Sequence, residues 1–417
     1  MLRKKPLISL GILGLGLAVS GLLFGWPHGP GEPAPPPASA PPAPREERPA
    51  PPPRGEMERA LKVGVIGPQS GEEAAYGRRV LGGILMAAKR FNQAGGIGGR
   101  QIEVLHYDNE SNPQYTQQIA AYLIKQKVAA IFSAPTGWSA FGPTHLANQS
   151  ATLFITVGTR RKIGRGGGYV FNYALPDETA IRGLLKFAVG QAGYVNFALV
   201  TSSAYDFSLT VSALFKRSAP GTGGRIVTEA DTYDTFSGTT DFGPVLAAVR
   251  ASPEPLHALI FTGRDKQGAS LALALRAAGI DLPIIGGEDL FTQAYLKQGG
   301  AAVIDSLVYA SFSPHRDTAR VAEFMRDVAA TKGARSDRFT ALAYDAFTLV
   351  ARAIGKAGST RSSAVRKALL EANAFDGATG KTRWTPGGSP IKQPFIHRVE
   401  KDGAGSKFVL LRTETDL

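Results

Sequence analysis

The sequence predicts an α/β fold in which parallel strands alternate with covering helices. Leu61–Gly67 is a short apolar run rich in β-branched residues, as in a buried strand. From Tyr76 apolar residues recur at helical spacing until a run of glycines, and residues 102–107 form a second apolar strand. A strand, helix and strand in this order need a crossover, so the sheet is parallel and helices cover its faces. The 417 residues suffice for two such lobes.

The same alternation continues along the chain, with apolar runs separated by turn residues and amphipathic segments. The further expected strands are 128–132, 153–157, 196–201, 225–229, 257–262, 283–286 and 305–313. The further expected helices open at Pro113 and at residues 204–207 and span 141–149, 179–192, 267–279, 320–330, 341–357 and 362–371. The last segments, 375–384, 396–399 and 408–411, are typical of hairpins.

Two loops that follow strands are candidates for a binding wall. In parallel α/β sheets ligands bind beyond the carboxyl ends of the strands, which points to residues 68–77 after the first strand. Residues 133–139 place small and hydroxyl side chains before a helix, where exposed N–H groups suit a carboxylate. The alternative for the second loop is an ordinary helix cap.

Composition and motifs exclude several classes of function. The chain has no cysteine, which excludes disulfides, thiolate metal sites and cysteine nucleophiles. Its net charge of +13 fits either a basic surface near anionic lipid or a positively charged ligand site. Nucleic acid is not expected as a partner, because no basic run or aromatic-interleaved basic motif occurs. The six histidines form no metal-binding pair and G-x-S-x-G is absent, so we expect no enzyme, catalytic residue, metal or cofactor.

The amino-terminal segment predicts export. Residues 7–26 carry no charge and follow a short basic stretch, and a helix of this length spans the ~30 Å hydrocarbon core of a bilayer. Residues 18–20 form a small-x-small cleavage site, so residues 1–26 could be a removable signal peptide. The apolar run continues past that site, so the alternative is an uncleaved membrane anchor. Residues 27–56 are rich in proline and alanine and form an extended tether.

Three spaced motifs then carry a resemblance to a known family. Residues 68–77 read P-x-S-G-x-x-A-x-Y-G, residues 92–104 read N-x-A-G-G-I-x-G-R-x-I-E-V, and residues 107–113 read Y-D-x-x-x-x-P. In this order they resemble the opening of the leucine/isoleucine/valine-binding protein family, the periplasmic solute receptors of ATP-driven uptake systems. The resemblance extends over roughly residues 61 to 412.

The resemblance implies the type I periplasmic binding fold, with two doubly wound parallel-sheet lobes joined by a three-segment hinge. Lobe I would comprise residues 57–177 and 312–389, and lobe II residues 178–311 and 390–417. A solute that contacts both lobes would stabilise a closed form by its differential affinity.

The resemblance also implies ligand contacts in lobe I. They are Tyr76, the carboxylate-binding hydroxyl of Thr136, and Gly158 with Thr159 after the next strand. The family usually continues with small residues, whereas here Arg160 and Arg161 follow. Arginine binds carboxylates bidentately, so a cleft-facing Arg160 predicts a ligand more acidic than, or shaped differently from, an apolar amino acid. The alternative is that both arginines point to solvent.

In lobe II the resemblance assigns three contacts. Tyr205 matches a tyrosine whose ring lies on the ligand, although it could instead cap the surface between the lobes. Arg264 stands where the family often has an aromatic residue, and Glu288 matches the carboxylate that binds an ammonium. The alternative for Glu288 is a helix-capping acid, a role that Asp289 could also take.

The function implied is an extracytoplasmic receptor that captures a small polar ligand, such as an amino acid, an amide or an organic acid. By resemblance its protein partner is the permease of an ATP-binding-cassette transporter. If residues 7–26 are not cleaved, the membrane is a second partner and the receptor is tethered to the inner membrane. A sensory receptor of the same fold, which signals to a protein partner, is the alternative.

Overall fold

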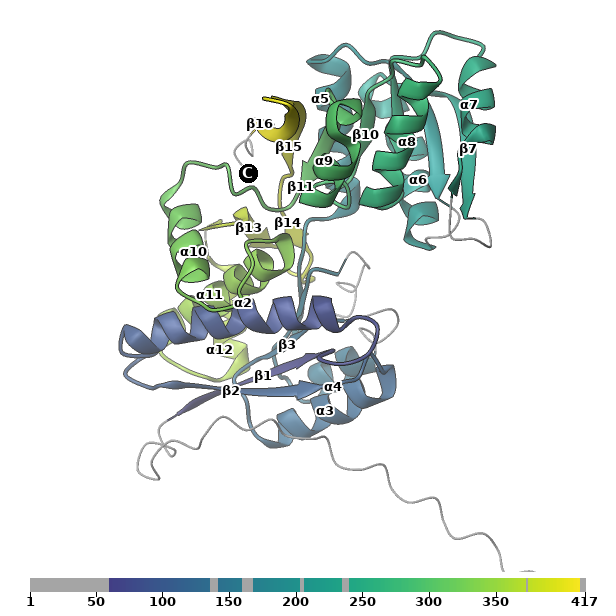
Figure 1. The fold of residues 1–417 in the computed structure, drawn as a ribbon. Coiled ribbons are helices and arrows are strands. Elements are labelled where there is room, and N and C mark those ends of the chain that lie inside the picture. The colour runs from purple at the N-terminus through teal and green to yellow at the C-terminus, as the bar shows by residue number, and fades with distance from the viewer. Residues whose placement is uncertain are drawn as a thin grey trace, which may run out of the picture. The chain divides into compact units, whose positions relative to one another are not determined.

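The computed structural model describes residues 60–135, 142–159, 168–202, 206–234, 240–372 and 374–412, and it contains two large sheets (Figure 1). The first sheet has the order β2-β1-β3-β4-β5, and all its strands are parallel. Its strands are β1 (Leu61–Gly67), β2 (Ile102–Asp108), β3 (Ile131–Ser133), β4 (Phe154–Val157) and β5 (Val170–Tyr173). Because β2 lies next to β1 and parallel to it, the chain between them must cross over, as predicted.

The second sheet has the order β16-β15-β11-β10-β9-β6-β7-β8. Its central strands are parallel, whereas β15, β16 and β8 are antiparallel additions at the two edges. Its strands are β6 (Asn196–Ser202), β7 (Arg225–Asp234), β8 (Thr240–Asp241), β9 (Ala258–Phe261), β10 (Ile284–Gly286), β11 (Leu307–Ala310), β15 (Phe395–Asp402) and β16 (Gly405–Arg412). Antiparallel edge strands of this kind are common in doubly wound sheets.

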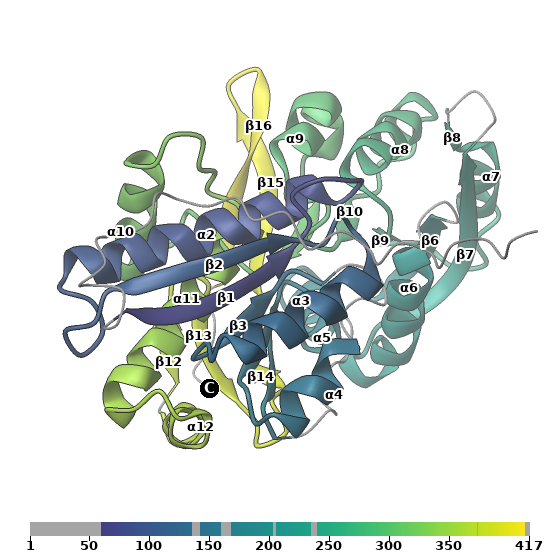
Figure 2. The same cartoon turned by 90° about the horizontal axis from the view of Figure 1, so that it is seen from below.

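Helices cover both faces of the first sheet. On one face, apolar residues of α2 and α11 pack in one core with α10 and α12, and Figure 2 shows α2 lying along β1 and β2. On the other face, α3 and α4 form a smaller core with β1, β3, β4 and β5. These helices are α2 (Ala74–Gln93), α3 (Pro113–Lys125), α4 (Gly142–Gln149), α10 (Ala319–Ala329), α11 (Arg338–Ala357) and α12 (Ser362–Leu370).

The second sheet is covered in the same way. Helices α5 and α6 pack on one face, and α7, α8 and α9 pack on the other. These helices are α5 (Asp177–Gly190), α6 (Asp206–Ser218), α7 (Gly243–Arg250), α8 (Asp265–Ala277) and α9 (Gln293–Gly299), with short 3-10 turns at Pro220–Thr222 and Gly300–Val303. Each sheet with its helices is one lobe, and the predicted two-lobed α/β fold is confirmed.

The lobes are joined by three connections, because the chain leaves the first sheet after β5, returns after β11 and crosses again after β14. A small antiparallel sheet lies next to these crossings and consists of β12 (Phe375–Gly377), β13 (Gly380–Trp384) and β14 (Pro390–Ile391). The exact lobe boundaries predicted from the sequence stay a proposal.

The predicted elements differ from the observed ones mainly at their ends. Helix α2 begins at Ala74 instead of Tyr76, and β3 occupies Ile131–Ser133 instead of 128–132. Helix α9 had no counterpart among the expected elements. It is short and polar on its exposed side, and Thr292 begins it by accepting a hydrogen bond from the Tyr295 N–H.

The turn between β12 and β13 joins the connections to the first lobe through buried polar groups. Arg316, on the second connection, donates to the carbonyls of Gly377 (3.3 Å) and Ala378 (3.4 Å). Lys392, on the third connection, is buried and donates to the hydroxyls of Thr379 and Thr382, both at 2.9 Å. Two of the three connections are therefore fixed to one turn.

Two further contacts complete this anchoring. Asp345 of α11 accepts from the N–H groups of Ala378 (3.0 Å) and Thr379 (2.7 Å). Burial raises the pKa of the Asp345 carboxyl, and the nearby ammonium of Lys392 opposes that shift. The Trp384 indole donates to the carbonyl of Asn172 in β5 (2.7 Å), which ties the strand before the first connection to the same small sheet.

The predictions for the amino-terminal segments lie outside the described residues. None of the helices that the structure describes is both long and apolar enough to cross a membrane. Residues 7–26 and 27–56 are not among the described residues, so the signal peptide, the anchor and the tether stay predictions.

A glycine pair within α2 tests how the loop after β1 is held. A Cβ at Gly77 would lie 1.8 Å from the Pro68 carbonyl oxygen, whereas a Cβ at Gly82 would meet nothing within 4 Å. We expect Gly77→Ala to lower the free energy of unfolding by about 2–3 kcal/mol because the loop must move. Gly82→Ala, the matched control, should raise it by about 0.5–1 kcal/mol. Urea unfolding followed by circular dichroism measures both, and equal effects of the two substitutions would contradict this packing.

Candidate functional site

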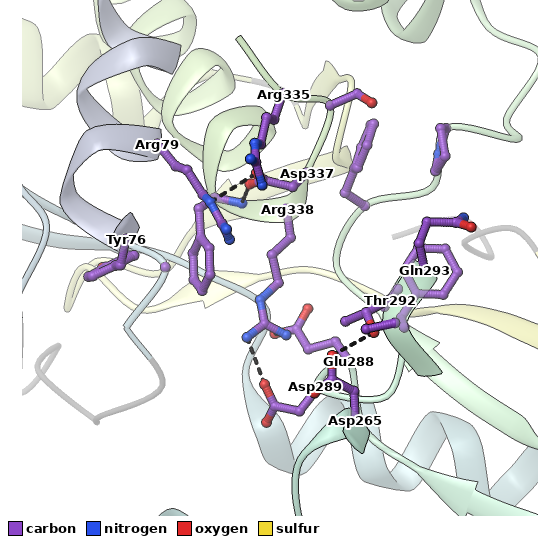
Figure 3. Close-up of a pocket in the computed structure, with 18 of the residues that line it drawn as sticks. Tyr76, Arg79, Asp265, Glu288, Asp289, Thr292, Gln293, Arg335, Asp337 and Arg338 are labelled. Atoms are coloured by element: carbon purple, nitrogen blue, oxygen red, sulfur yellow. Dashed lines mark hydrogen bonds and ion pairs between the residues drawn. The ribbon is translucent and has the colours of Figure 1, made fainter. Parts of the chain in front are cut away.

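A cavity of about 1090 Å³ opens between loops from both lobes (Figure 3). From the first lobe it is lined by the segments that follow β1, β3 and β4, and by the segment before α11. From the second lobe it is lined by the segments that follow β9, β10 and β11. The cavity therefore lies at the carboxyl ends of strands in both sheets, where α/β folds bind ligands.

All five of the predicted site residues that the structure describes line this cavity. They are Tyr76, Gly158, Thr159, Arg264 and Glu288. The other predicted contacts, Thr136, Arg160 and Tyr205, lie outside the described residues, as does Arg161. Pro135, directly before Thr136, also lines the cavity. The roles of all these residues in binding stay predictions.

Tyr76 forms an apolar wall in the first lobe. Its hydroxyl donates to the Val157 carbonyl, and its ring meets the Phe339 ring edge-on with centroids 4.7 Å apart. Burial raises the pKa of the Tyr76 hydroxyl, and the charge of Glu73 adds to this. Gly158 has φ +73°, and a Cβ there would lie 3.0 Å from the Phe339 ring, so glycine permits this close approach.

Thr159 lies beside this wall with only 8% of its surface exposed. Its carbonyl accepts a hydrogen bond from the Asn172 side chain (3.3 Å), whose amide oxygen lies 3.1 Å from the Thr156 hydroxyl. The segment after β4 is thus fixed to β5 through Asn172.

The second lobe contributes an acidic wall formed by Glu288 and Asp289 after β10. Glu288 is almost buried, and its Oε2 accepts from the N–H (3.0 Å) and the hydroxyl (2.6 Å) of Ser311. Neither acid caps the following helix, because Thr292 does so and is itself held by Asp265 (2.7 Å). The helix-capping alternative for Glu288 is therefore wrong for α9.

One arginine of the first lobe reaches this acidic wall. Arg338, the first residue of α11, donates through Nη2 to Asp289 Oδ1 at 2.7 Å, and its Nη1 lies 3.8 Å from Glu288 Oε1 (Figure 3). Asp337 begins α11 by accepting from the N–H of Phe339 (3.0 Å), and it pairs with Arg79 of α2 (3.4 Å). Arg338 carries no local signal that marks it as a site residue, although Asp337 before an apolar run is typical of a helix start.

Aromatic side chains form another part of the second-lobe wall. Phe291 and Phe408 line the cavity with ring centroids 4.5 Å apart. The fully buried ring of His397 packs on Phe291 at 4.3 Å, and its Nε2 lies 2.9 Å from the Ser313 hydroxyl. Burial, with the nearby His315, lowers the pKa of His397 to about 3.

The chemistry of this lining suits binding of a small organic solute. It combines apolar rings, a hydroxyl, carboxylates and guanidinium groups, which supply dispersion contacts, hydrogen bonds and charge. In the described part of the chain, no three histidine or acidic side chains gather in a way that could hold a metal ion.

Comparisons with known proteins agree with this architecture. The sequence profile of the periplasmic binding protein family matches residues 60–404. Leu/Ile/Val-binding protein homolog 3 of Brucella melitensis is 25% identical over 334 residues, which cover 79% of this chain and 88% of that protein.

Two solved structures share the fold. The branched-chain amino acid transporter substrate binding protein of Streptococcus pneumoniae, in complex with isoleucine, aligns with a TM-score of 0.66 at 24% identity, covering 84% of this chain and 100% of that chain. A solute binding protein of an ABC transporter from Rhodopseudomonas palustris, in complex with 3,4-dihydroxy benzoic acid, aligns with a TM-score of 0.68 at 22% identity, covering 85% and 96%.

The buried His397 predicts acid sensitivity. Its folded pKa of about 3 lies below the value of 6.5 in water, so its contribution to stability is complete above pH 6.5 and is lost as the pH falls toward 3. Between pH 7.5 and 4.5 we expect protonation of this residue alone to lower the free energy of unfolding by about 2–3 kcal/mol.

His397→Gln keeps a donor near Ser313 but cannot take up the proton. The loss of stability between pH 7.5 and 4.5, measured by urea unfolding, should be smaller in His397→Gln by that amount. His145→Gln, which removes an exposed histidine of α4, is the matched control. Parallel pH profiles of wild type and His397→Gln would contradict the prediction.

Proposed function

The chain belongs to the periplasmic binding protein family, and we propose that it is a solute receptor that holds a small polar ligand in the cavity between its two lobes. The proposed ligands are an amino acid, an amide or an organic acid. The ligand would be delivered to the permease of an ATP-binding-cassette transporter. The family resemblance seen in the sequence is confirmed by the family profile and by the Brucella relative.

The observation that carries this proposal is the position of the cavity at strand ends of both lobes. Its lining includes Tyr76 and Thr159 from the first lobe and Arg264 and Glu288 from the second. A solute that touches both walls gains contacts that either lobe alone cannot provide, and this differential affinity favours a closed arrangement.

Each wall of the cavity has its own proposed role in binding. Tyr76 supplies an apolar surface, and Thr159 with Gly158 presents hydroxyl and backbone groups to a carboxylate. Arg264 and Glu288 contribute charge from the opposite wall. Thr136, Arg160 and Tyr205 remain proposed contacts on the ground of the family resemblance.

We place the receptor outside the cytoplasmic membrane. Family membership supports this location, and the apolar residues 7–26 after a basic start fit either export with cleavage or retention as an anchor. The proline-rich residues 27–56 would then keep a retained receptor at a distance from the bilayer.

A solute screen tests the proposal. We expect at least one compound among amino acids, amides, dicarboxylates and aromatic acids to raise the melting temperature, because a ligand that binds only the folded state stabilises it by ~2.7 kcal/mol at a hundredfold excess over Kd. Differential scanning fluorimetry makes the measurement, and a panel in which no solute raises the melting temperature would count against the receptor.

Two cavity variants locate the binding site of any solute found. Tyr76→Ala and Thr159→Val should each weaken its affinity at least tenfold in calorimetric titration, because each removes a wall contact. The matched control is Tyr122→Ala, which removes a tyrosine of α3 that is 40% exposed and is not part of the cavity lining. Equal affinity of Tyr76→Ala and wild type would place the solute elsewhere.

A further inference from the structure

The acidic wall of the cavity already has its partners within the protein. Glu288 Oε2 accepts two hydrogen bonds from Ser311, and Glu288 Oε1 lies 3.8 Å from the Arg338 guanidinium. Only 9% of the Glu288 side chain is exposed. A ligand ammonium at this carboxylate would therefore meet a group that is both enclosed and paired.

Arg338 places a single cation beside both acids, so Glu288 and Asp289 share one guanidinium partner. It forms an ion pair with Asp289 at 2.7 Å and lies near Glu288, while its Cζ stands 4.6 Å from the centroid of the Phe339 ring. With 21% of the Arg338 side chain exposed, this charge is partly shielded from water, which strengthens its interactions inside the cavity.

The position of this cation has a direct consequence for the ligand. An ammonium group that approached Glu288 would have to displace Arg338 or be repelled by it, because like charges are unfavourable at short range. A carboxylate without an ammonium does not meet this penalty. We propose that Arg338 makes the cavity selective for a carboxylate solute that lacks an ammonium group, an inference that rests on the receptor function proposed above.

The remaining lining indicates what the rest of such a solute looks like. Aromatic rings line the cavity from both lobes, and these are Tyr76, Phe207, Phe291, Phe312, Phe339 and Phe408. They provide an extended apolar surface that favours a ring or a branched chain. Arg79, Arg264 and Arg335 line the cavity as well, beside the carboxylates of Glu73, Asp265 and Asp337, and supply guanidinium groups of the kind that bind a ligand carboxylate. The solute class is thus a carboxylate with an apolar body.

Matched pairs of solutes test this selectivity on the intact chain. L-leucine with 4-methylpentanoate, L-phenylalanine with 3-phenylpropanoate, and L-glutamate with glutarate each differ only in the α-ammonium. In isothermal titration calorimetry at neutral pH, we expect the member without the ammonium to bind at least tenfold more tightly in every pair that binds.

The variant Arg338→Gln tests the residue itself. Without the guanidinium, Glu288 and Asp289 lose the positive charge beside them, so the preference for the member without the ammonium should fall at least tenfold. The control is Arg90→Gln, which removes an arginine paired with Glu323 (3.0 Å) and Asp327 (3.5 Å) away from the cavity lining. Arg90→Gln should leave the ratio of affinities unchanged.

The outcomes separate this inference from the receptor proposal. Tighter binding of the amino acid in any pair, or an unchanged ratio in Arg338→Gln, would overturn the selectivity and leave the receptor function standing. Binding of neutral amides alone in the wider screen would do the same. If no solute binds in the pairs or in the screen, both proposals fall together.

Discussion

The buried turn between β12 and β13 is the constraint on which the arrangement of the two lobes depends. Arg316 and Lys392, from two different connections, donate to backbone and hydroxyl groups of this turn, and Asp345 of α11 accepts from its N–H groups. Charges that are taken out of water are costly unless they are paired or hydrogen-bonded, so these hydrogen bonds hold the connections in one geometry. The strand ends of both sheets consequently border the same cavity, which is what a solute receptor requires.

Within the cavity, the distribution of charge is set by contacts between the lobes. The acids after β10 would make one wall strongly negative, but Arg338 extends from α11 and pairs with Asp289. The same helix start holds Arg79 through Asp337, so one helix terminus organises two cations. The ion pair is also a link between the lobes, which a bound solute must accommodate or replace.

The fold could be predicted from local patterns in the sequence, and the place of the site from the strand ends together with the family resemblance. Apolar runs and glycine stops define strand and helix order, and the rule on strand ends points to the loop that holds Tyr76. The family resemblance added Thr159 and Glu288, which line the same cavity. Arg338 and Asp289 could not be paired this way, since they belong to different lobes and no local motif links them. The contact between the His397 and Phe291 rings could not be predicted either, because no local motif links the two residues. They meet only because the third connection brings β15 back to the second sheet.

Clamping of the solute by both lobes can be measured directly as a distance between them. The chain has no cysteine, so Lys125→Cys in α3 and Lys266→Cys in α8 provide one spin label on each lobe without background. Double electron–electron resonance with and without saturating 3-phenylpropanoate then reports the separation. We predict a shorter and narrower distance distribution when the solute is bound. A distribution that stays unchanged while calorimetry shows saturation would contradict binding between the lobes.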